Sequence, residues 1–414
     1  MNTQSTDLAT CLVCGVRDVE VVLDLGVTAL ANKFLSTDEL KLPEPSFPLR
    51  LGYCPACGHV QLADRVPPAM MFDDYLYMSS LSETLVRHLH SLARVVTSWR
   101  GLGANDLVLD VGCNDCTLLE GFRKCGVKIL GIDPAQNLAA IARDKGVTVV
   151  TGYFGAATAR EIRSKHGPLS AITATNVFPH IPNLADFMSG VDAALDANGV
   201  LVIEAHYLLD MLEQAAFDTI YHEHVSFWSL AAMQRLFGAH GFEVVDCERL
   251  PIHHGQLRVF VQRKGVRKPT AAVANLLAAE QMAGIPGKNA LVRFAEQARA
   301  VQTGLRKIVA DIKASGKRVA GYGAPAKGST LISFAGLGPK DILWIADKSP
   351  LKQGRYTPQT HIPVVPTDRI LADMPEYLVL FAWNFAEEIM AQQGEYRRRG
   401  GKFILPVPEV RIAT

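Results

Sequence analysis

The sequence predicts an α/β protein in which a small cysteine-bearing module precedes two doubly wound α/β units. Two Cys-x-x-Cys pairs lie near the start, among short strand-like stretches broken by Gly and Pro. From residue 106, apolar strand-like stretches alternate with helical patterns, which favours a parallel sheet, and two stretches within residues 242–264 favour an antiparallel edge. The alternation resumes after residue 267, behind long helical stretches rich in Ala, Leu and Gln. The chain of 414 residues is also longer than one core usually serves, so several domains are expected.

The charge balance excludes several classes of partner. The chain carries 42 basic and 41 acidic side chains, so we expect neither a nucleic-acid partner nor a membrane partner. No stretch approaches 18 uninterrupted apolar residues, and the N-terminus lacks the basic and apolar regions of a signal peptide. We therefore expect a cytoplasmic monomer whose eight cysteines are thiols or metal ligands.

The first module, residues 1–66, carries a four-cysteine pattern. Each Cys-x-x-Cys pair is followed directly by Gly, which permits the tight turn that points both thiolates at one ion. Two such pairs form a tetrahedral site for which zinc is the first candidate, and closed thiolate ligation makes that zinc structural. Four unrelated thiols or a redox pair are the alternatives. The predicted ligands are Cys11, Cys14, Cys54 and Cys57. A helical pattern over residues 67–100 predicts a connector to the next unit.

The second unit, residues 101–266, opens with a strand, a glycine-bearing turn and a helix start. Asp133 ends the next strand, where a carboxylate can reach the hydroxyl groups of a ribose. The turn lacks the Gly-x-Gly of a dinucleotide site, and the Asp-x-Gly-x-x-x-Gly pattern of S-adenosylmethionine sites fits better, with Cys116 replacing the last Gly. A redox or metal role for Cys113 and Cys116, or a purely structural turn, are the alternatives. The predicted cofactor-binding residues are Asp110, Gly112, Asn114, Asp115, Asp133 and Asn176.

A dense group of reactive side chains lies at residues 221–224, which read Tyr-His-Glu-His. His180 and His253 follow other strand-like stretches. In a doubly wound sheet the loops after strand ends converge on the ligand crevice, so these groups should meet near the cofactor. Imidazole and phenol groups are suited to proton abstraction, so the cluster predicts general-base chemistry. A metal site, or histidines that only form hydrogen bonds within the core, are the alternatives.

The last unit, residues 267–414, carries a turn with Gly and Lys after a strand, at residues 321–328. The turn resembles a phosphate cradle, although its spacing is not that of a P-loop. A diphosphate group is the expected ligand, bound by the glycines of the turn and Lys327. A structural turn with a solvated Lys is the alternative.

Together these motifs resemble the sugar C-methyltransferases of deoxysugar biosynthesis, over nearly the whole chain. The resemblance rests on the double Cys-x-x-Cys front, the Asn-Asp variant of the cofactor loop, the run FDTIYHEH from Phe217 and the run GYGAPAKG from Gly321. It implies a zinc-binding N-terminal domain, a central Rossmann-like methyltransferase domain that binds S-adenosylmethionine, and a C-terminal Rossmann-like α/β domain. It also implies that a nucleotide-linked 4-keto sugar of the dTDP type binds between the last two domains.

The resemblance further implies methylation of C3 of the sugar. A base would remove the proton that the neighbouring ketone acidifies, and the enolate would take the methyl group. Matched positions imply Tyr221 and His224 as candidates for the base, and the full set of implied catalytic residues is Tyr221, His224, Glu223, His180 and Tyr75. The implied substrate-binding residues are Tyr75, which would close over the sugar, and Tyr77, His222, His253, Tyr322 and Lys327.

The chain departs from the family pattern at three places near the expected cleft. Cys116 stands where the family has Gly, Phe178 and Pro179 precede His180, and residues 253–256 read His-His-Gly-Gln. The first departure is expected to place a side chain near the cofactor. Two other functions remain open from the sequence: an NAD-dependent oxidoreductase or epimerase, and a non-catalytic sugar-nucleotide-binding protein.

Overall fold

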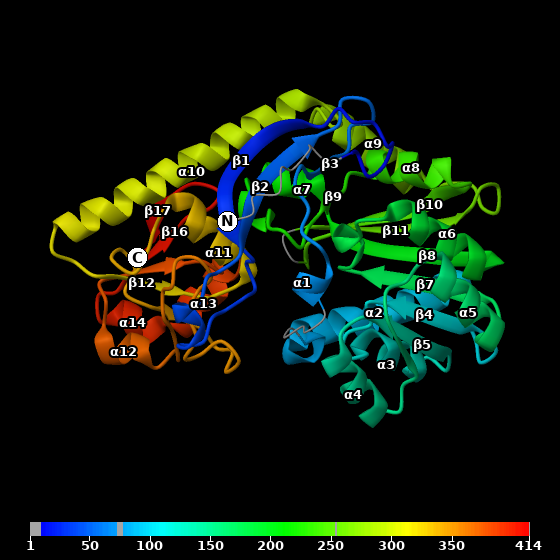
Figure 1. The fold of residues 1–414 in the computed structure, drawn as a ribbon, viewed down its shortest axis with the longest axis horizontal. Helices are drawn as coiled ribbons and strands as arrows, with labels where there is room; N and C mark the ends of the chain where they lie inside the picture. The colour runs from blue at the N-terminus through cyan, green and yellow to red at the C-terminus, as the bar shows by residue number, and fades with distance from the viewer. Residues whose placement is uncertain (1–9, 73–77, 253–254, 414) are drawn as a thin grey trace.

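A computed structural model of the chain describes residues 10–72, 78–252 and 255–413. Three sheets make up its framework. In Figure 1 the N-terminal strands lie between a central unit and a C-terminal unit. The long helix α10 (Lys288–Ala314) runs along the top of that view, from the C-terminal unit towards the helices of the central one.

The N-terminal sheet is antiparallel, in the order β1-β2-β3-β9. Its elements are β1 (Glu20–Ala29), the 3₁₀ turn η1 (Glu39–Lys41), β2 (Ser46–Tyr53), β3 (Val60–Leu62) and β9 (Ser226–Phe227). The last strand comes from the central unit, where Val60 pairs with Phe227 and Gln61 pairs with Ser226. The module is therefore joined directly to the segment that follows the Tyr-His-Glu-His run.

The central sheet has seven strands in the order β10-β11-β8-β7-β4-β5-β6. They are β4 (Leu107–Val111), β5 (Lys128–Asp133), β6 (Val149–Thr151), β7 (Leu169–Thr175), β8 (Leu195–His206), β10 (Phe242–Leu250) and β11 (Gln256–Arg263). β4 to β8 are parallel, whereas β11 is antiparallel to β8 and β10, which confirms the predicted antiparallel pair. The winding reverses between β4 and β7, the position where doubly wound sheets bind ligands.

Helices cover both faces of the central sheet and supply several turns around the cavity. They are α1 (Ala69–Phe72), η2 (Ser79–Leu81), α2 (Glu83–Arg100), α3 (Thr117–Lys124), α4 (Gln136–Asp144), α5 (Ala156–His166), η3 (Phe178–His180), α6 (Leu184–Ala194), α7 (Leu208–Glu213), η4 (Phe217–Thr219) and α8 (Leu230–Ala239). The Ser82 hydroxyl accepts the Leu85 N–H and starts α2, and Gly101, with a φ of 70°, ends it. The apolar stripe of α2 packs against α3, because its buried residues recur at helical spacing: Leu85, Leu89, Leu92, Ala93 and Val96.

The C-terminal sheet has six strands in the order β14-β13-β12-β15-β16-β17, and only β17 is antiparallel. The strands are β12 (Val319–Tyr322), β13 (Ile345–Ala346), β14 (Val364–Val365), β15 (Tyr377–Leu380), β16 (Lys402–Leu405) and β17 (Arg411–Ala413). The other helices of this region are α9 (Ala271–Met282), α11 (Ala326–Ala335), α12 (Arg369–Asp373), η6 (Trp383–Phe385), α13 (Ala386–Gln392) and α14 (Gly394–Arg398). Here the winding reverses between β12 and β15.

The central strands of both parallel sheets are buried on both faces. Every residue of β12 and β15 is buried, and so are the first six of β7. This is the burial expected when helices cover both faces of a parallel sheet, so the predicted α/β class with a cysteine module in front is confirmed. Among the described helices, none combines the length and apolar character needed to cross a membrane.

Candidate active site and metal module

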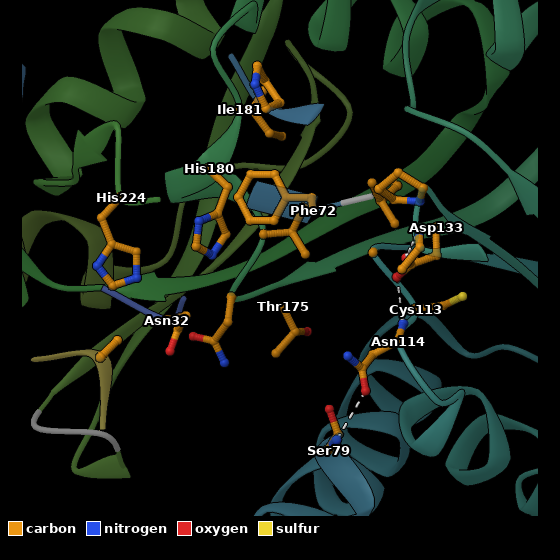
Figure 2. Close-up of a pocket in the computed structure, with 18 of the residues that line it drawn as sticks. Asn32, Phe72, Ser79, Cys113, Asn114, Asp133, Thr175, His180, Ile181 and His224 are labelled. Atoms are coloured by element: carbon orange, nitrogen blue, oxygen red, sulfur yellow. Dashed lines mark hydrogen bonds between the residues drawn. The ribbon is translucent and has the colours of Figure 1, made fainter. Parts of the chain in front are cut away.

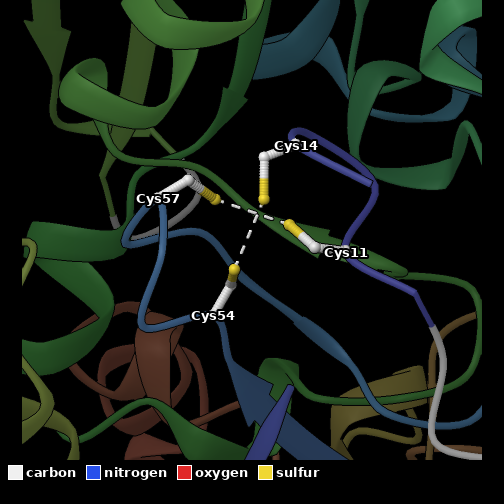
Figure 3. A group of neighbouring side chains, drawn as sticks. All are labelled: Cys11, Cys14, Cys54 and Cys57. Atoms are coloured by element: carbon white, nitrogen blue, oxygen red, sulfur yellow. Dashed lines mark hydrogen bonds between the residues drawn. The ribbon is translucent and has the colours of Figure 1, made fainter. Parts of the chain in front are cut away.

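The four cysteines of the N-terminal module converge on one point (Figure 3). Their sulfur atoms all lie within 4.8 Å of one another. The turns after the first cysteine of each pair close when Gly15 and Gly58 donate their N–H groups to the carbonyls of Cys11 and Cys54, and both glycines have positive φ. Four converging thiols are the donor set of a closed tetrahedral zinc site, so these residues fit the metal that the spacing predicts.

Two ligands of this set, Cys11 and Cys57, are coupled by a hydrogen bond. Their Sγ atoms lie 3.4 Å apart, and this hydrogen bond lowers the pKa of Cys11 and raises the pKa of Cys57. Zinc binds thiolates and not thiols, so metal entry displaces the proton that the pair shares.

A cavity of about 880 Å³ opens where the carboxyl ends of the parallel strands of both α/β sheets meet (Figure 2). Its lining comes from all three regions of the chain. Asn32 belongs to the N-terminal region, Asp133 and His224 to the central unit, and Lys327 to the C-terminal unit. One cavity thus holds a carboxylate end, an imidazole centre and a lysine end.

The carboxylate end is built by the turns after β4 and β5. Gly112 has a φ of +65°, and a Cβ there would lie 2.3 Å from Val177 Cγ2, so the turn admits only Gly. The two carboxylate oxygens of Asp133 accept the N–H groups of Asn114 and Ala135, each at 2.9 Å. Asp133 lines the cavity, and each of its carboxylate oxygens keeps a further lone pair that can accept a ribose hydroxyl. Gly112 and Asp133 therefore fit the adenosine part of S-adenosylmethionine.

The other predicted cofactor residues are placed differently. Asp110 lines the cavity, and burial raises its pKa to about 7 although Thr173 donates a hydrogen bond to it. Asn114 also lines the cavity, while its side-chain oxygen accepts the Ser79 N–H at 3.0 Å. Asp115 lies outside the cavity lining: its side chain accepts hydrogen bonds from Ser80 and Thr117 and fixes the loop.

Cys116 does not point at the cofactor site, which corrects the sequence expectation. It is fully buried and packs in an apolar cluster with Cys113, Leu119, Ala142 and Val147. Its φ of +66° at the start of α3 explains why Gly is the common residue there. Gly112, Cys113 and Asn114 are the residues of this loop that line the cavity, whereas the Cys113 side chain packs in the same apolar cluster as Cys116.

The histidines at the centre of the cavity are held in one tautomer. His224 places its Nδ1 2.7 Å from the Thr219 carbonyl, and His180 places its Nδ1 2.6 Å from the Glu223 carbonyl. A carbonyl can only accept, so both Nδ1 atoms carry the proton. No described residue forms a hydrogen bond to Nε2 of His224, and His224 lines the cavity. The unprotonated Nε2 of His224 therefore offers a lone pair to a ligand in the cavity.

The surroundings of His224 keep it neutral. Burial lowers its pKa well below the usual value, and the nearby His206 and His180 lower it further. The His206 ring centroid is 4.7 Å from that of His224, and the Tyr221 ring is closer still, at 4.1 Å. Neutral imidazole is the form that accepts a proton, so the cluster can act as a general base.

The lysine end lies at the start of α11. Lys327 Nζ sits 4.4 Å above the Trp383 ring, and burial lowers its pKa to about 8 although the charge of Asp218 opposes the shift. The indole N–H of Trp383 donates to Asp218 at 2.6 Å. Lys352, also on the cavity wall, donates to the Ala324 carbonyl at 2.7 Å. Two partly buried lysines at one end of a cavity suit an anionic group.

Some predicted residues lie away from the cavity. His222 is buried against the N-terminal sheet, where its Nε2 lies 3.2 Å from the Pro48 carbonyl. Tyr322 is buried in the core around β12 and does not line the cavity. Tyr75, Tyr77 and His253 lie outside the described residues.

The cavity residues that the sequence did not predict include Asn32, Phe72, His206 and Lys352. His206 ends β8, and its place after a strand was a usable signal because such positions converge on the crevice. Phe72 packs edge-on against His180, with the ring centroids 5.3 Å apart. Asn32 and Lys352 lie in irregular segments, where no periodicity indicates the direction of a side chain.

Comparison with known proteins matches three successive regions of the chain. Family models match residues 11–72 as a putative zinc binding domain, 85–246 as a methyltransferase domain and 251–408 as a C-methyltransferase C-terminal domain. The C-methyltransferase NovU of Streptomyces niveus is 36% identical over 405 residues, which cover 98% of this chain and 96% of that protein. The chain belongs to the C-methyltransferase family.

Membership decides among the functions that the sequence left open. The protein is an S-adenosylmethionine-dependent C-methyltransferase with a zinc-binding N-terminal domain, as the motifs predicted. More distant similarity is confined to part of the chain. A ubiquinone biosynthesis O-methyltransferase of Azorhizobium caulinodans is 24% identical over 40% of this chain and 68% of its own. The structure of magnesium protoporphyrin IX methyltransferase from Synechocystis PCC 6803 covers 43% of this C-methyltransferase and 83% of its own chain, at 15% identity and a TM-score of 0.33.

Proposed function

We propose that this C-methyltransferase methylates C3 of a nucleotide-diphosphate-linked 4-keto-deoxysugar, through an enolate that His224 generates. The observation that carries the proposal is the neutral His224, whose Nε2 faces a cavity that also holds Asp133 and Lys327. A carbon acceptor has no lone pair, so carbon methylation needs a base and an acidified C–H bond. A ketone beside the acceptor carbon supplies that acidity.

His224 Nε2 takes the proton from C3, and the electron pair moves into the enolate. The Nδ1–H bond to Thr219 keeps the imidazole oriented and supports the positive charge that it gains. When bound, S-adenosylmethionine supplies the electrophilic methyl group. A positioned general base contributes roughly 10²–10⁴-fold, and alignment of the reacting carbons supplies much of the remainder. Tyr221, in ring contact with His224, and His180 line the sugar region.

The diphosphate is proposed to lie at the lysine end of the cavity. Lys327 and Lys352 both line it there. The start of α11 also lines this end through Pro325 and Ala326, and helix N-termini favour anions. A thymidine diphosphate sugar is the first substrate to test, because the motif resemblance implies the dTDP type.

The test combines methyl transfer with proton exchange. The wild-type enzyme is incubated with methyl-labelled S-adenosylmethionine and a dTDP-4-keto-6-deoxysugar, and the new C–CH₃ group is located by NMR. In a parallel reaction with S-adenosylhomocysteine in D₂O, the wild type should exchange the C3 proton for deuterium. Absence of both products with every 4-keto sugar nucleotide tried, despite bound cofactor, would rule out the proposal.

Variants assign the base. His224→Ala should lower exchange and methyl transfer by about 10²–10⁴-fold while the affinity for S-adenosylmethionine stays within about twofold. A similar loss of exchange and methyl transfer in Tyr221→Phe would show that the phenol also takes part in proton removal. His166→Ala, on the exposed end of α5, is the matched control. Wild-type exchange rates in His224→Ala would remove this residue from the proton transfer.

A further inference from the structure

Residues 30–35 connect the N-terminal sheet to the C-terminal unit through fixed contacts. The Ala31 carbonyl accepts the Ser329 hydroxyl at 3.0 Å. Leu35 and Tyr356 exchange both backbone hydrogen bonds, at 2.9 and 2.8 Å. Ala31 and Leu35 are both buried. The segment is therefore part of the packed structure, and contacts with the C-terminal unit fix its backbone path.

Within this segment, Asn32 faces the catalytic centre. Asn32 lines the cavity, and Figure 2 shows its side chain beside those of His180 and His224. Its Nδ2 donates to Glu223 Oε1 at 2.7 Å. Glu223 is almost fully buried and does not line the cavity, so Asn32 stands between this carboxyl group and the ligand space.

The contact with Glu223 fixes which end of the Asn32 amide faces the ligand. The ionised form of Glu223 has only acceptor atoms, so in that form the amide nitrogen of Asn32 is the atom that meets it. The amide oxygen then lies on the other side, and no described residue forms a hydrogen bond to it. The structure thus presents an oriented hydrogen-bond acceptor inside the cavity.

Glu223 is itself held in place by all three regions. Its carbonyl accepts the His180 Nδ1–H, and its side chain accepts from Asn32. Burial raises the pKa of this carboxyl group to about 7, and the hydrogen bond from Asn32 and the positive charge of Lys352, whose Nζ lies 5.0 Å from the Phe34 ring centroid, oppose the rise. The carboxyl group is the anchor on which the orientation of Asn32 depends.

We propose that Asn32 is a substrate-positioning residue, whose side-chain oxygen accepts a hydrogen bond from a hydroxyl or amino group of the sugar beside His224. This inference rests on the proposed function and adds a residue to its substrate site. It makes the zinc-bearing region part of the active site, because that region delivers the residue. The alternative is that Asn32 only docks the N-terminal module onto Glu223.

The experiment compares Asn32→Ala and Asn32→Asp with Lys33→Ala, an exposed neighbour that serves as control. Pairs of dTDP-4-keto-6-deoxysugars that carry or lack one hydroxyl, at C2 or at C3, are the probes. The wild type should prefer the hydroxyl-bearing member of one pair by about 10-fold or more, and this preference should fall below about threefold in Asn32→Ala. The KM for the sugar nucleotide should rise, while zinc content and the affinity for S-adenosylmethionine stay at wild-type levels.

Asn32→Asp keeps an acceptor oxygen but places two carboxyl groups together, so its substrate affinity should recover at lower pH, where one of them is protonated. This variant keeps the inference testable if Asn32→Ala folds poorly. Unchanged hydroxyl preference and unchanged KM in the Asn32 variants would overturn the inference and leave the proposed function standing. Loss of zinc or of thermal stability with unchanged preference would show docking alone and would also overturn it. A wild type that methylates no such sugar overturns both.

Discussion

The two α/β units share a backbone plan but carry opposite charge at the cavity. In each, a glycine with positive φ follows the first strand of the unit: Gly112 after β4 and Gly323 after β12. A Cβ on either glycine would collide with a residue that follows the neighbouring strand on the other side of the winding reversal. At Gly112 it would lie 2.3 Å from Val177 Cγ2, after β7, and at Gly323 it would lie 2.7 Å from Ala382 Cβ, after β15. The two turns are thus built by the same close approach of neighbouring loops.

The aspartates after the second strand repeat the parallel. Asp133 accepts backbone N–H groups from Asn114 and Ala135, and Asp347 accepts them from Ala324 and Ser349. Only Asp133 lines the cavity; in the second unit, Lys327 and Lys352 do so instead. Backbone plan therefore does not identify the ligand. The side chains that reach the shared cavity differ, with carboxylates in the first unit and lysines in the second, and we propose that they face the sulfonium cofactor and the diphosphate respectively.

Among tests of this comparison between the two units, the largest expected effect comes from removing the module that joins them. Chelation of zinc, or Cys54→Ser, should lower methyl transfer by about 100-fold or more, because metal binding supplies folding free energy to such modules. Affinity for S-adenosylmethionine should change by less than about threefold, since the carboxylate end lies wholly in the central unit. Metal analysis, calorimetry and turnover measure this, with Cys125→Ser as control. Full turnover in zinc-free protein would show that the units work without the module.

Crossed variants test whether each unit serves one ligand. Asp133→Asn should weaken S-adenosylmethionine binding about 10- to 100-fold, and Lys327→Met should weaken sugar-nucleotide binding by a similar factor, as for lost charge-assisted hydrogen bonds. Neither should affect the other ligand by more than about twofold. Asp347→Asn is the matched control for Asp133→Asn. Calorimetry with each ligand measures both affinities in each variant. If either variant weakened the binding of both ligands, the assignment of one ligand to each unit would be wrong.

The pH dependence of binding should have opposite sign in the two units. Asp110 has a pKa raised to about 7 by burial, so its negative charge, and the affinity for the cationic cofactor, increase as pH rises from 6 to 8. Lys327 has a pKa lowered to about 8, so its positive charge, and the affinity for the diphosphate, decrease as pH rises from 7 to 9. Each change is at most about tenfold per pH unit. Titrations at several pH values measure both, and Lys327→Met should flatten the second profile.

The smallest effect is expected from Cys116→Gly. Gly relieves the strain of a φ of +66°, roughly 1 kcal/mol, but loses a similar amount of buried apolar contact. Stability should therefore change by less than about 1 kcal/mol, and cofactor affinity by less than about twofold, as melting curves and calorimetry can show. A larger change in affinity would mean that the cluster behind the loop controls the cofactor end.

Local patterns in the sequence were sufficient for much of the site. The four zinc ligands follow from two Cys-x-x-Cys-Gly turns, because residues three apart in such a turn must face the same ion. Gly112 and Asp133 follow from strand ends, whose side of the sheet is fixed by the parallel winding. The α/β class, the methyl donor and the C-methyltransferase family also came from such patterns.

Only the tertiary structure decided which residues of the Tyr-His-Glu-His run line the cavity. Tyr221 and His224 line the cavity, whereas His222 packs on Pro48. The run is an irregular turn without a period, and pairing of β9 with the distant β3 sets its orientation. The place of Asn32 in the cavity lining has the same cause. Its direction depends on contacts with segments hundreds of positions away, which local sequence does not encode.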